Sequence, residues 1–241
     1  MRIQVLGVGF DNLSMNEAVS QALEEIAHRG EGYVVTPNPE IVWLCKENPD
    51  FAALVSNARL VLADGVGITL GAKILGQPLK ARVPGVDFAA ALFAEMAKHG
   101  QSVFLYGAKP GVADRAGETL KRQYSGLQIA GTADGYGDNA PVVEAIRAAK
   151  PDLLLVCLGA PRQEEFMARY QGTLNVGLMA GLGGTLDVLA GEVTRAPKGW
   201  KKLGLEWLYR LLKDPRRAKR MLKLPLFLFA VIGERLRGGK V

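Results

Sequence analysis

The sequence predicts an α/β fold: a Rossmann-like, mostly parallel sheet flanked by helices, followed by a basic amphipathic helical appendage at the C-terminus. From Ser102 onward, short aliphatic runs alternate with helical patterns, which is the strand–helix order of a parallel sheet. The run at 153–158 is continuously apolar, as a strand covered on both faces should be. Residues 195–241 hold 14 Lys/Arg and 3 Asp/Glu, a net +11, whereas residues 1–194 hold 16 and 21, a net −5. We therefore divide the chain into an α/β core, 1–194, and an appendage, 195–241.

The elements follow from local signals. The run from Ile3 to Phe10 reads as a first strand, and Ser14 with Glu17 has the spacing of a capping box for a helix that ends near Gly30. Pro39 suits the first turn of another helix. Further strands are expected at 33–35, 60–62, 103–106, 127–130, 153–158 and 176–179, with helical segments between them.

Composition places the chain among ordinary globular proteins, with 49% hydrophobic and 22% charged residues. Its two cysteines, Cys45 and Cys157, lie inside apolar segments and suit neither a metal site nor a disulfide framework, so we expect buried thiols in a reducing compartment. Because the first residues read as a strand, no signal peptide is expected and the cytoplasm is the predicted location.

Polar residues follow two of the expected strands and predict a ligand site. Thr36, Asn38 and Glu40 come after one strand and Asp64 after the next. Ligands of open α/β sheets bind where such strand ends emerge, so these side chains should face one crevice. Asp64 would take a proton from an attacking hydroxyl; the alternative is that it only caps the helix behind it. Arg82 is a candidate anion contact, or a solvated loop residue.

Glycine-rich turns after strands suggest a nucleotide, because they leave room for phosphate at helix N-termini. Neither a complete G-x-G-x-x-G fingerprint nor a Walker Gly-Lys-Ser/Thr occurs, so an NAD-type oxidoreductase is not supported. No clustered Asp-x-Asp motif is present, and His28 and His99 lie near expected helix ends. We therefore expect no metal and no cofactor.

The appendage combines basic and apolar residues. The segment 200–212 is amphipathic, 215–220 is basic, and 224–232 is an apolar run too short for the roughly 20 residues that span a bilayer. Such a segment is typical of one that lies on an acidic membrane surface. Two alternatives are a core-packing helix with a solvated face and a nucleic-acid-binding tail, whose binding would be salt-sensitive. Tail Trp and Leu residues would also serve a homo-oligomeric contact.

Several short stretches occur in one order along nearly the whole chain. They are TPN at 36–38, DG at 64–65, RVPG at 82–85, GAPRQE at 159–164, GLGG at 181–184, RAP at 195–197 and LGLEWLYRL at 203–211. In these stretches the sequence resembles the WecG/TagA/CpsF glycosyltransferases, or glycosyltransferase family 26. The resemblance implies inverting transfer of a sugar, typically N-acetylmannosamine, from a UDP donor to polyprenyl-diphosphate-linked N-acetylglucosamine. In the TagA-like branch, this is a step of wall teichoic acid linkage-unit synthesis.

The resemblance also implies roles for individual residues. Asp64 matches the family's proposed catalytic base, and Thr36, Asn38, Arg82 and Gln163 match residues that bind substrate. Tyr136, Gln163 and Asp187 match positions that hold the uridine nucleotide. Arg210, Arg217 and Arg220 match arginines thought to close over the leaving diphosphate. Fixed cations of this kind would replace a metal in stabilising the leaving group. Arg162 stands where many members have Lys, which keeps the charge.

The resemblance leaves the donor open. The main prediction is UDP-N-acetylmannosamine with an undecaprenyl-linked acceptor, at the inner face of the membrane; a different donor, such as a UDP-linked N-acetylmannosaminuronate or glucose, is the alternative. A nucleic-acid-binding module is a more distant alternative. It leaves the Asp64 crevice without a function, and the Leu/Phe run of the tail fits lipid better than nucleic-acid bases. We therefore expect no nucleic acid as a partner.

Overall fold

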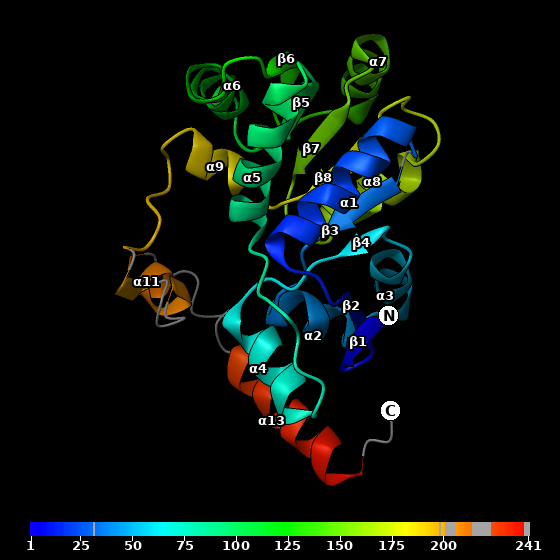
Figure 1. Cartoon of the computed structure of the whole chain (residues 1–241), viewed down its shortest axis with the longest axis vertical. Coiled ribbons are helices and arrows are strands. Elements are labelled where there is room, and N and C mark those ends of the chain that lie inside the picture. Colours follow the sequence, from blue (N-terminus) through cyan, green and yellow to red (C-terminus); the bar gives the residue numbers. More distant parts are fainter. Residues whose placement is uncertain (31, 198, 201–205, 214–222, 239–241) are drawn as a thin grey trace.

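A computed structural model describes residues 1–30, 32–197, 199–200, 206–213 and 223–238. Its centre is a six-stranded, all-parallel sheet in the order β4-β3-β8-β7-β5-β6 (Figure 1). The strands are β3 (Gly32–Val35), β4 (Leu60–Val61), β5 (Ser102–Gly107), β6 (Gln128–Ala133), β7 (Leu153–Cys157) and β8 (Leu178–Gly181). The predicted α/β class is confirmed, and β8 lies between β3 and β7, which brings the two halves of the core together.

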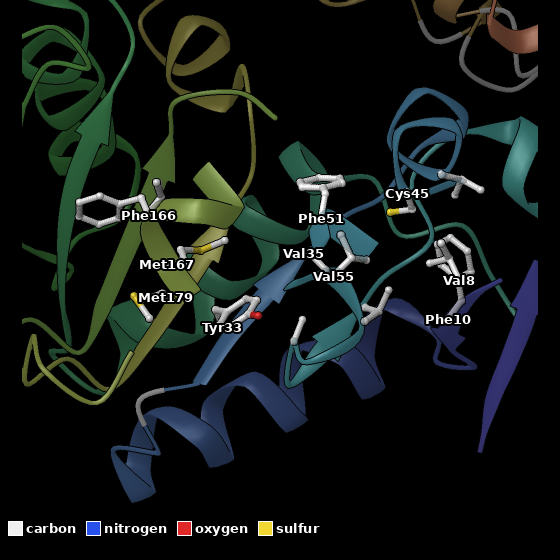
Figure 2. Packing of buried hydrophobic residues seen from close by; sticks show 14 of the residues in the cluster. Val8, Phe10, Tyr33, Val35, Cys45, Phe51, Val55, Phe166, Met167 and Met179 are labelled. Carbon is white, nitrogen blue, oxygen red and sulfur yellow. The ribbon is translucent and has the colours of Figure 1, made fainter. Parts of the chain in front are cut away.

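Helices cover both faces of the sheet. One face carries α1 (Met15–His28), α5 (Gly85–Lys98), α6 (Val112–Gln123) and α9 (Thr185–Leu189); the other carries α2 (Pro39–Glu47), α3 (Pro49–Ser56), α7 (Asn139–Ala149) and α8 (Arg162–Tyr170). Along the strands, alternate residues enter the two cores: Val34 joins the first, whereas Tyr33 and Val35 join the second. Figure 2 shows Tyr33 in that second core, to which Phe51 and Met167 of the covering helices also belong.

The N-terminal segment differs from the prediction of a single strand. It forms a two-stranded antiparallel hairpin, β1 (Arg2–Val5) and β2 (Val8–Asp11), outside the main sheet. The chain reverses at Leu6 and Gly7, both with positive φ (50° and 84°), which matches the two-residue turn that suits twisted hairpins. Leucine rarely adopts a positive φ, so the alternating sequence pattern of this segment predicted a continuous strand and not a turn.

Two predicted helix starts are confirmed in detail. The Ser14 side chain accepts a hydrogen bond from the Glu17 N–H, and the Glu17 carboxylate accepts one from the Ser14 N–H, at 2.7 Å. Pro39 opens α2, where Asn38 is the N-cap. Both cysteines are buried free thiols, as predicted, and burial raises the pKa of each to about 12.

The appendage contributes α11 (Glu206–Lys213) and α13 (Lys223–Leu236) to the described chain. In Figure 1, α13 runs alongside α4 (Val66–Ile74), and Phe227 and Val231 are fully buried there. Two glycines of α4 permit this close approach: a Cβ at Gly71 would lie 3.1 Å from the Phe227 ring, and one at Gly67 would lie 2.9 Å from Leu224 Cδ1. One face of α13 is therefore a core-packing face.

The opposite face of α13 is exposed and apolar. Leu226, Phe229, Ile232 and Leu236 lie on it, with Phe229 71% and Leu236 81% exposed. Pro225 lies in the first turn of α13, where proline is tolerated. Among the described helices, none combines the length and apolarity that crossing a bilayer requires. The basic run 215–220 lies outside the described residues, and the division at residue 194 stays a prediction.

Candidate active site

A cavity of about 590 Å³ opens at the carboxyl ends of β3, β4, β7 and β8. This is the edge at which ligands of parallel α/β sheets bind. The cavity brings together residues that lie far apart in the sequence, from Thr36 to Leu224. Of the residues predicted from the sequence, it is lined by Thr36, Asn38, Glu40, Asp64, Arg82, Gln163 and Asp187.

The backbone after β3 fixes Thr36 and Asn38. Thr36 is a buried polar residue, and a Cβ on Gly85 would lie 3.2 Å from its Oγ1, so the start of α5 packs closely against the hydroxyl. Asn38 Oδ1 accepts a hydrogen bond from the Ile41 N–H at 3.0 Å and thereby caps α2. The Nδ2 donors of Asn38 are not used by this cap and can serve a ligand in the cavity.

Backbone hydrogen bonds place Asp64 and Arg82 on adjoining segments. The Asp64 N–H donates to the Pro37 carbonyl at 3.2 Å, and the Val83 N–H donates to the Ala63 carbonyl at 2.8 Å. The loop carrying Arg82 is thus held against the segment carrying Asp64. Gly65 is the N-cap of α4, with φ of 95°, so Asp64 lies one residue before the cap position.

Helix N-termini at the cavity favour an anionic ligand. Gly65 to Gly67 at the start of α4 and Gly85 at the start of α5 line the cavity. The N-cap residues of these two helices, Gly65 and Pro84, make no side-chain hydrogen bond to the first turn. The unpaired N–H groups of a first turn and the positive end of the helix dipole both attract phosphate.

Gln163 and Glu164 form a buried polar pair in the first turn of α8. Gln163 Nε2 donates to Glu164 Oε1 at 2.9 Å, and Gln163 Oε1 accepts from the Gly183 N–H at 3.0 Å. The Glu164 side chain is fully buried, and desolvation raises the pKa of its carboxyl to about 7, although its bond to Gln163 opposes this shift. The carboxyl therefore keeps its proton at much higher pH than an exposed glutamate would.

Glu164 makes the free energy of unfolding depend on pH. Its folded pKa of about 7 lies above the value of 4.5 for a solvated glutamate, so the folded state binds the proton more tightly and stability falls as pH rises between these values. Glu164→Gln removes this titration. We expect the variant to gain about 3 kcal/mol relative to wild type between pH 4 and pH 8, measured by urea unfolding at both pH values. A difference that does not change with pH would contradict the assignment.

Not every predicted residue reaches the cavity. Tyr136 lies in the loop between β6 and α7, is 64% exposed, and does not line the cavity. Its N–H donates to Asp134 Oδ1 at 2.8 Å, which shapes the turn. Arg210 belongs to α11, but its side chain lies outside the described structure, as do Arg217 and Arg220 entirely. Their roles at the leaving group stay predictions.

The described part of the appendage forms one wall of the cavity, at the site over which the resemblance implied that tail arginines close. Arg195, Glu206, Trp207, Lys223 and Leu224 all line it. Three of these residues, Arg195, Glu206 and Trp207, belong to the matching stretches RAP at 195–197 and LGLEWLYRL at 203–211.

Arg195 connects this wall to the core. Its Nη1 and Nη2 donate to the two carboxylate oxygens of Asp87 in α5, the second at 3.0 Å, and its Nε lies 3.9 Å from Glu206 Oε1 in α11. The hydrogen bond to Asp87 raises the pKa of the guanidinium above its usual value, and the charges of Glu206 and Asp64 act in the same direction. Arg195 therefore links α5 and α11 electrostatically at the cavity.

Among the described residues, no three His, Cys, Asp or Glu side chains are grouped so as to hold a metal ion. The cations that the described residues supply to the cavity wall are Arg82, Arg195 and Lys223. Arg195 is engaged by Asp87, and Lys223 Nζ lies 3.8 Å from Glu47 Oε2.

Comparison with known proteins shows the family to which this chain belongs. The model of the glycosyl transferase WecG/TagA/CpsF family matches residues 3–241. A protein of Bacillus spizizenii is 39% identical over 201 residues, which cover 83% of this chain and 78% of the relative, and one of Bacillus subtilis is 36% identical over 202 residues. One of Staphylococcus aureus is 33% identical over 234 residues, covering 95% and 92%. All three are named N-acetylglucosaminyldiphosphoundecaprenol N-acetyl-beta-D-mannosaminyltransferase. The chain therefore belongs to the WecG/TagA/CpsF family of glycosyltransferases.

Proposed function

We propose that this protein transfers N-acetylmannosamine from UDP-N-acetylmannosamine to N-acetylglucosaminyl-diphosphoundecaprenol, with inversion at the anomeric carbon. The observation that carries the proposal is the cavity that gathers Asp64, Thr36, Asn38 and Gln163 at one sheet edge. The names of the relatives at 33–39% identity support the choice of donor sugar and acceptor.

The chemistry assigns a separate task to each part of the cavity. The Asp64 carboxylate takes the proton of an acceptor hydroxyl while that oxygen attacks the anomeric carbon. The new bond forms between this oxygen and the carbon, the bond from the carbon to the diphosphate breaks, and UDP leaves with the electron pair. The N-termini of α4 and α5, together with Arg82, stabilise the negative charge on the diphosphate.

The proposal also covers the residues that hold the nucleotide and the arginines that close over the diphosphate. Asp187 and Gln163 line the cavity and are proposed to hold the uridine nucleotide. Tyr136, which lies outside the cavity lining in the loop after β6, is proposed to contact a part of the nucleotide that extends beyond the cavity. Arg210, Arg217 and Arg220 are proposed to close over the diphosphate, so that no metal is needed.

The membrane is proposed as the surface on which the protein meets its lipid acceptor, on the inner side. The exposed apolar face of α13 and the net charge of +11 in residues 195–241 support binding to an acidic bilayer. Self-association through this face also stays a prediction.

Polar substitutions on that face test the membrane contact. The double variant Phe229→Ser, Leu236→Ser should lose most binding to vesicles containing acidic lipid, because it removes two large exposed apolar side chains. Flotation with vesicles measures the loss, and transfer to a water-soluble acceptor analogue should be unchanged. Undiminished flotation would remove α13 from the membrane contact, and binding to nucleic acid instead of vesicles would favour the alternative module.

The donor is tested with a panel of UDP-sugars. Each donor would be supplied with a short-chain polyprenyl-diphosphate N-acetylglucosamine, with and without EDTA. The donors are UDP-N-acetylmannosamine, UDP-N-acetylmannosaminuronate, UDP-glucose and UDP-N-acetylglucosamine. We expect turnover with the first only. Turnover with another sugar alone would keep the reaction class but replace the donor, and loss of turnover on adding EDTA would contradict metal independence.

A further inference from the structure

Glu164 is a buried acid whose position the proposed chemistry does not by itself explain. It is fully buried next to Gln163, and its charge adds to the larger effect of burial in raising the pKa values of Tyr33 in β3 and Cys45 in α2. Its Oε1 accepts from Gln163, but its Oε2 is buried without a hydrogen-bond partner in the described structure. A buried polar group left in this way costs stability, and an apolar side chain of similar size would avoid the cost. Such a group is commonly kept for a functional reason.

The hydrogen bonds around Gln163 fix the orientation of its amide. The Gly183 N–H can only donate, so the group facing it must be the amide oxygen, at 3.0 Å. Nε2 then faces Glu164 and donates one hydrogen to it, at 2.9 Å. The second Nε2 hydrogen is left for another acceptor, and Gln163 lines the cavity.

The end of β8 is shaped to hold this amide. A Cβ on Gly181 would lie 3.2 Å from Gln163 Nε2 and 2.6 Å from Met167 Cε, so only glycine leaves both side chains in place. The amide is thus enclosed by Gly181, Gly183 and Glu164, and it is 3% exposed.

We propose that Glu164 is a positioning residue that acts through Gln163. By accepting one Nε2 hydrogen, it locks the amide so that the other is presented to an acceptor oxygen of the sugar nucleotide. The inference rests on the proposed function for the identity of that ligand. The amide lock itself depends only on this chain's own residues.

Matched substitutions separate positioning from folding. Glu164→Gln keeps an acceptor oxygen for Gln163, whereas Glu164→Met has similar length but no comparable acceptor. We expect Glu164→Gln to stay within about threefold of wild-type kcat/KM for the UDP-sugar, and Glu164→Met to lose about 10- to 100-fold. Thermal unfolding would confirm that Glu164→Met folds, as replacing a buried acid with an apolar group allows.

A double-mutant cycle tests whether Glu164 acts through Gln163. In a Gln163→Met background, Glu164→Met should change kcat/KM by less than about twofold, because the partner it positions is gone. Losses that multiply, or a Glu164→Met variant as active as wild type, would overturn the proposal.

A second readout does not depend on turnover. Exchange of the Gln163 side-chain amide hydrogens with solvent, followed by ¹⁵N NMR, should be slow in wild type and Glu164→Gln and fast in Glu164→Met. If wild type transferred no sugar at all, the proposed function would fail. The exchange measurement would still show whether Glu164 fixes the orientation of the Gln163 amide. Equal exchange rates in all three proteins would overturn the amide lock.

Discussion

Replacing Asp64 with Asn is expected to lower sugar transfer by about 10²- to 10⁴-fold, the usual contribution of a general base. The substitution keeps the shape of the side chain but removes its ability to take the acceptor proton. UDP affinity should stay within a few-fold of wild type, because the proposed diphosphate contacts come from Arg82 and the N-termini of α4 and α5. Single-turnover transfer and calorimetric UDP binding measure the two effects separately.

Glu40 provides the matched control for Asp64. It is a second carboxylate lining the same cavity, at the start of α2. Glu40→Gln should therefore reduce transfer much less than Asp64→Asn. If the larger loss followed Glu40→Gln, the base would be Glu40, and if both variants turned over at the wild-type rate, neither carboxylate would be the base.

Removing residues 195–241 is expected to abolish transfer to the lipid-linked acceptor. The deletion takes away the cavity wall formed by Arg195, Glu206 and Trp207, together with the exposed apolar face of α13. It also uncovers the surface of α4 against which Phe227 and Val231 pack, so we expect the truncated protein to unfold at a lower temperature. Full activity in the truncated protein would contradict any role of the appendage in catalysis.

Two substitutions within α11 distinguish a role of this helix in the cavity wall from a role in folding stability. Trp207 lines the cavity, whereas Leu212 on the same helix is largely exposed. We expect Trp207→Ala to lower transfer to a water-soluble acceptor by about tenfold or more, as loss of a large packing contact commonly does, and Leu212→Ala to leave it unchanged. Equal effects of the two substitutions would show that α11 supports folding rather than the site.

Much of the site could be predicted from local sequence, because the carboxyl ends of parallel strands meet at the same edge of the sheet. Asn38 followed by Pro39 marks a helix start, and a polar residue directly after a short apolar run marks a strand end. These two rules bring Thr36, Asn38, Glu40 and Asp64 into one crevice without knowledge of the strand order. The role of Gln163 came from resemblance alone, because its position depends on Gly183, twenty residues away.

Other features depend on contacts between distant residues and could not be predicted. Arg195 pairs with Asp87 across 108 positions, and no local pattern specifies that contact. Glu164 stands in a polar stretch of the sequence, so its complete burial follows only from the packing of α8 against the sheet. The hairpin was missed because Leu6 adopts a positive φ that leucine rarely takes.

The configuration of the product tests the central claim most directly. Wild-type protein would be incubated with UDP-N-acetylmannosamine and a short-chain polyprenyl-diphosphate N-acetylglucosamine, and the new glycosidic bond examined by NMR. Direct attack by an acceptor oxygen activated by Asp64 predicts a β-linked disaccharide and an equal amount of UDP. An α-linked product, or UDP released with free sugar and no disaccharide, would contradict the account.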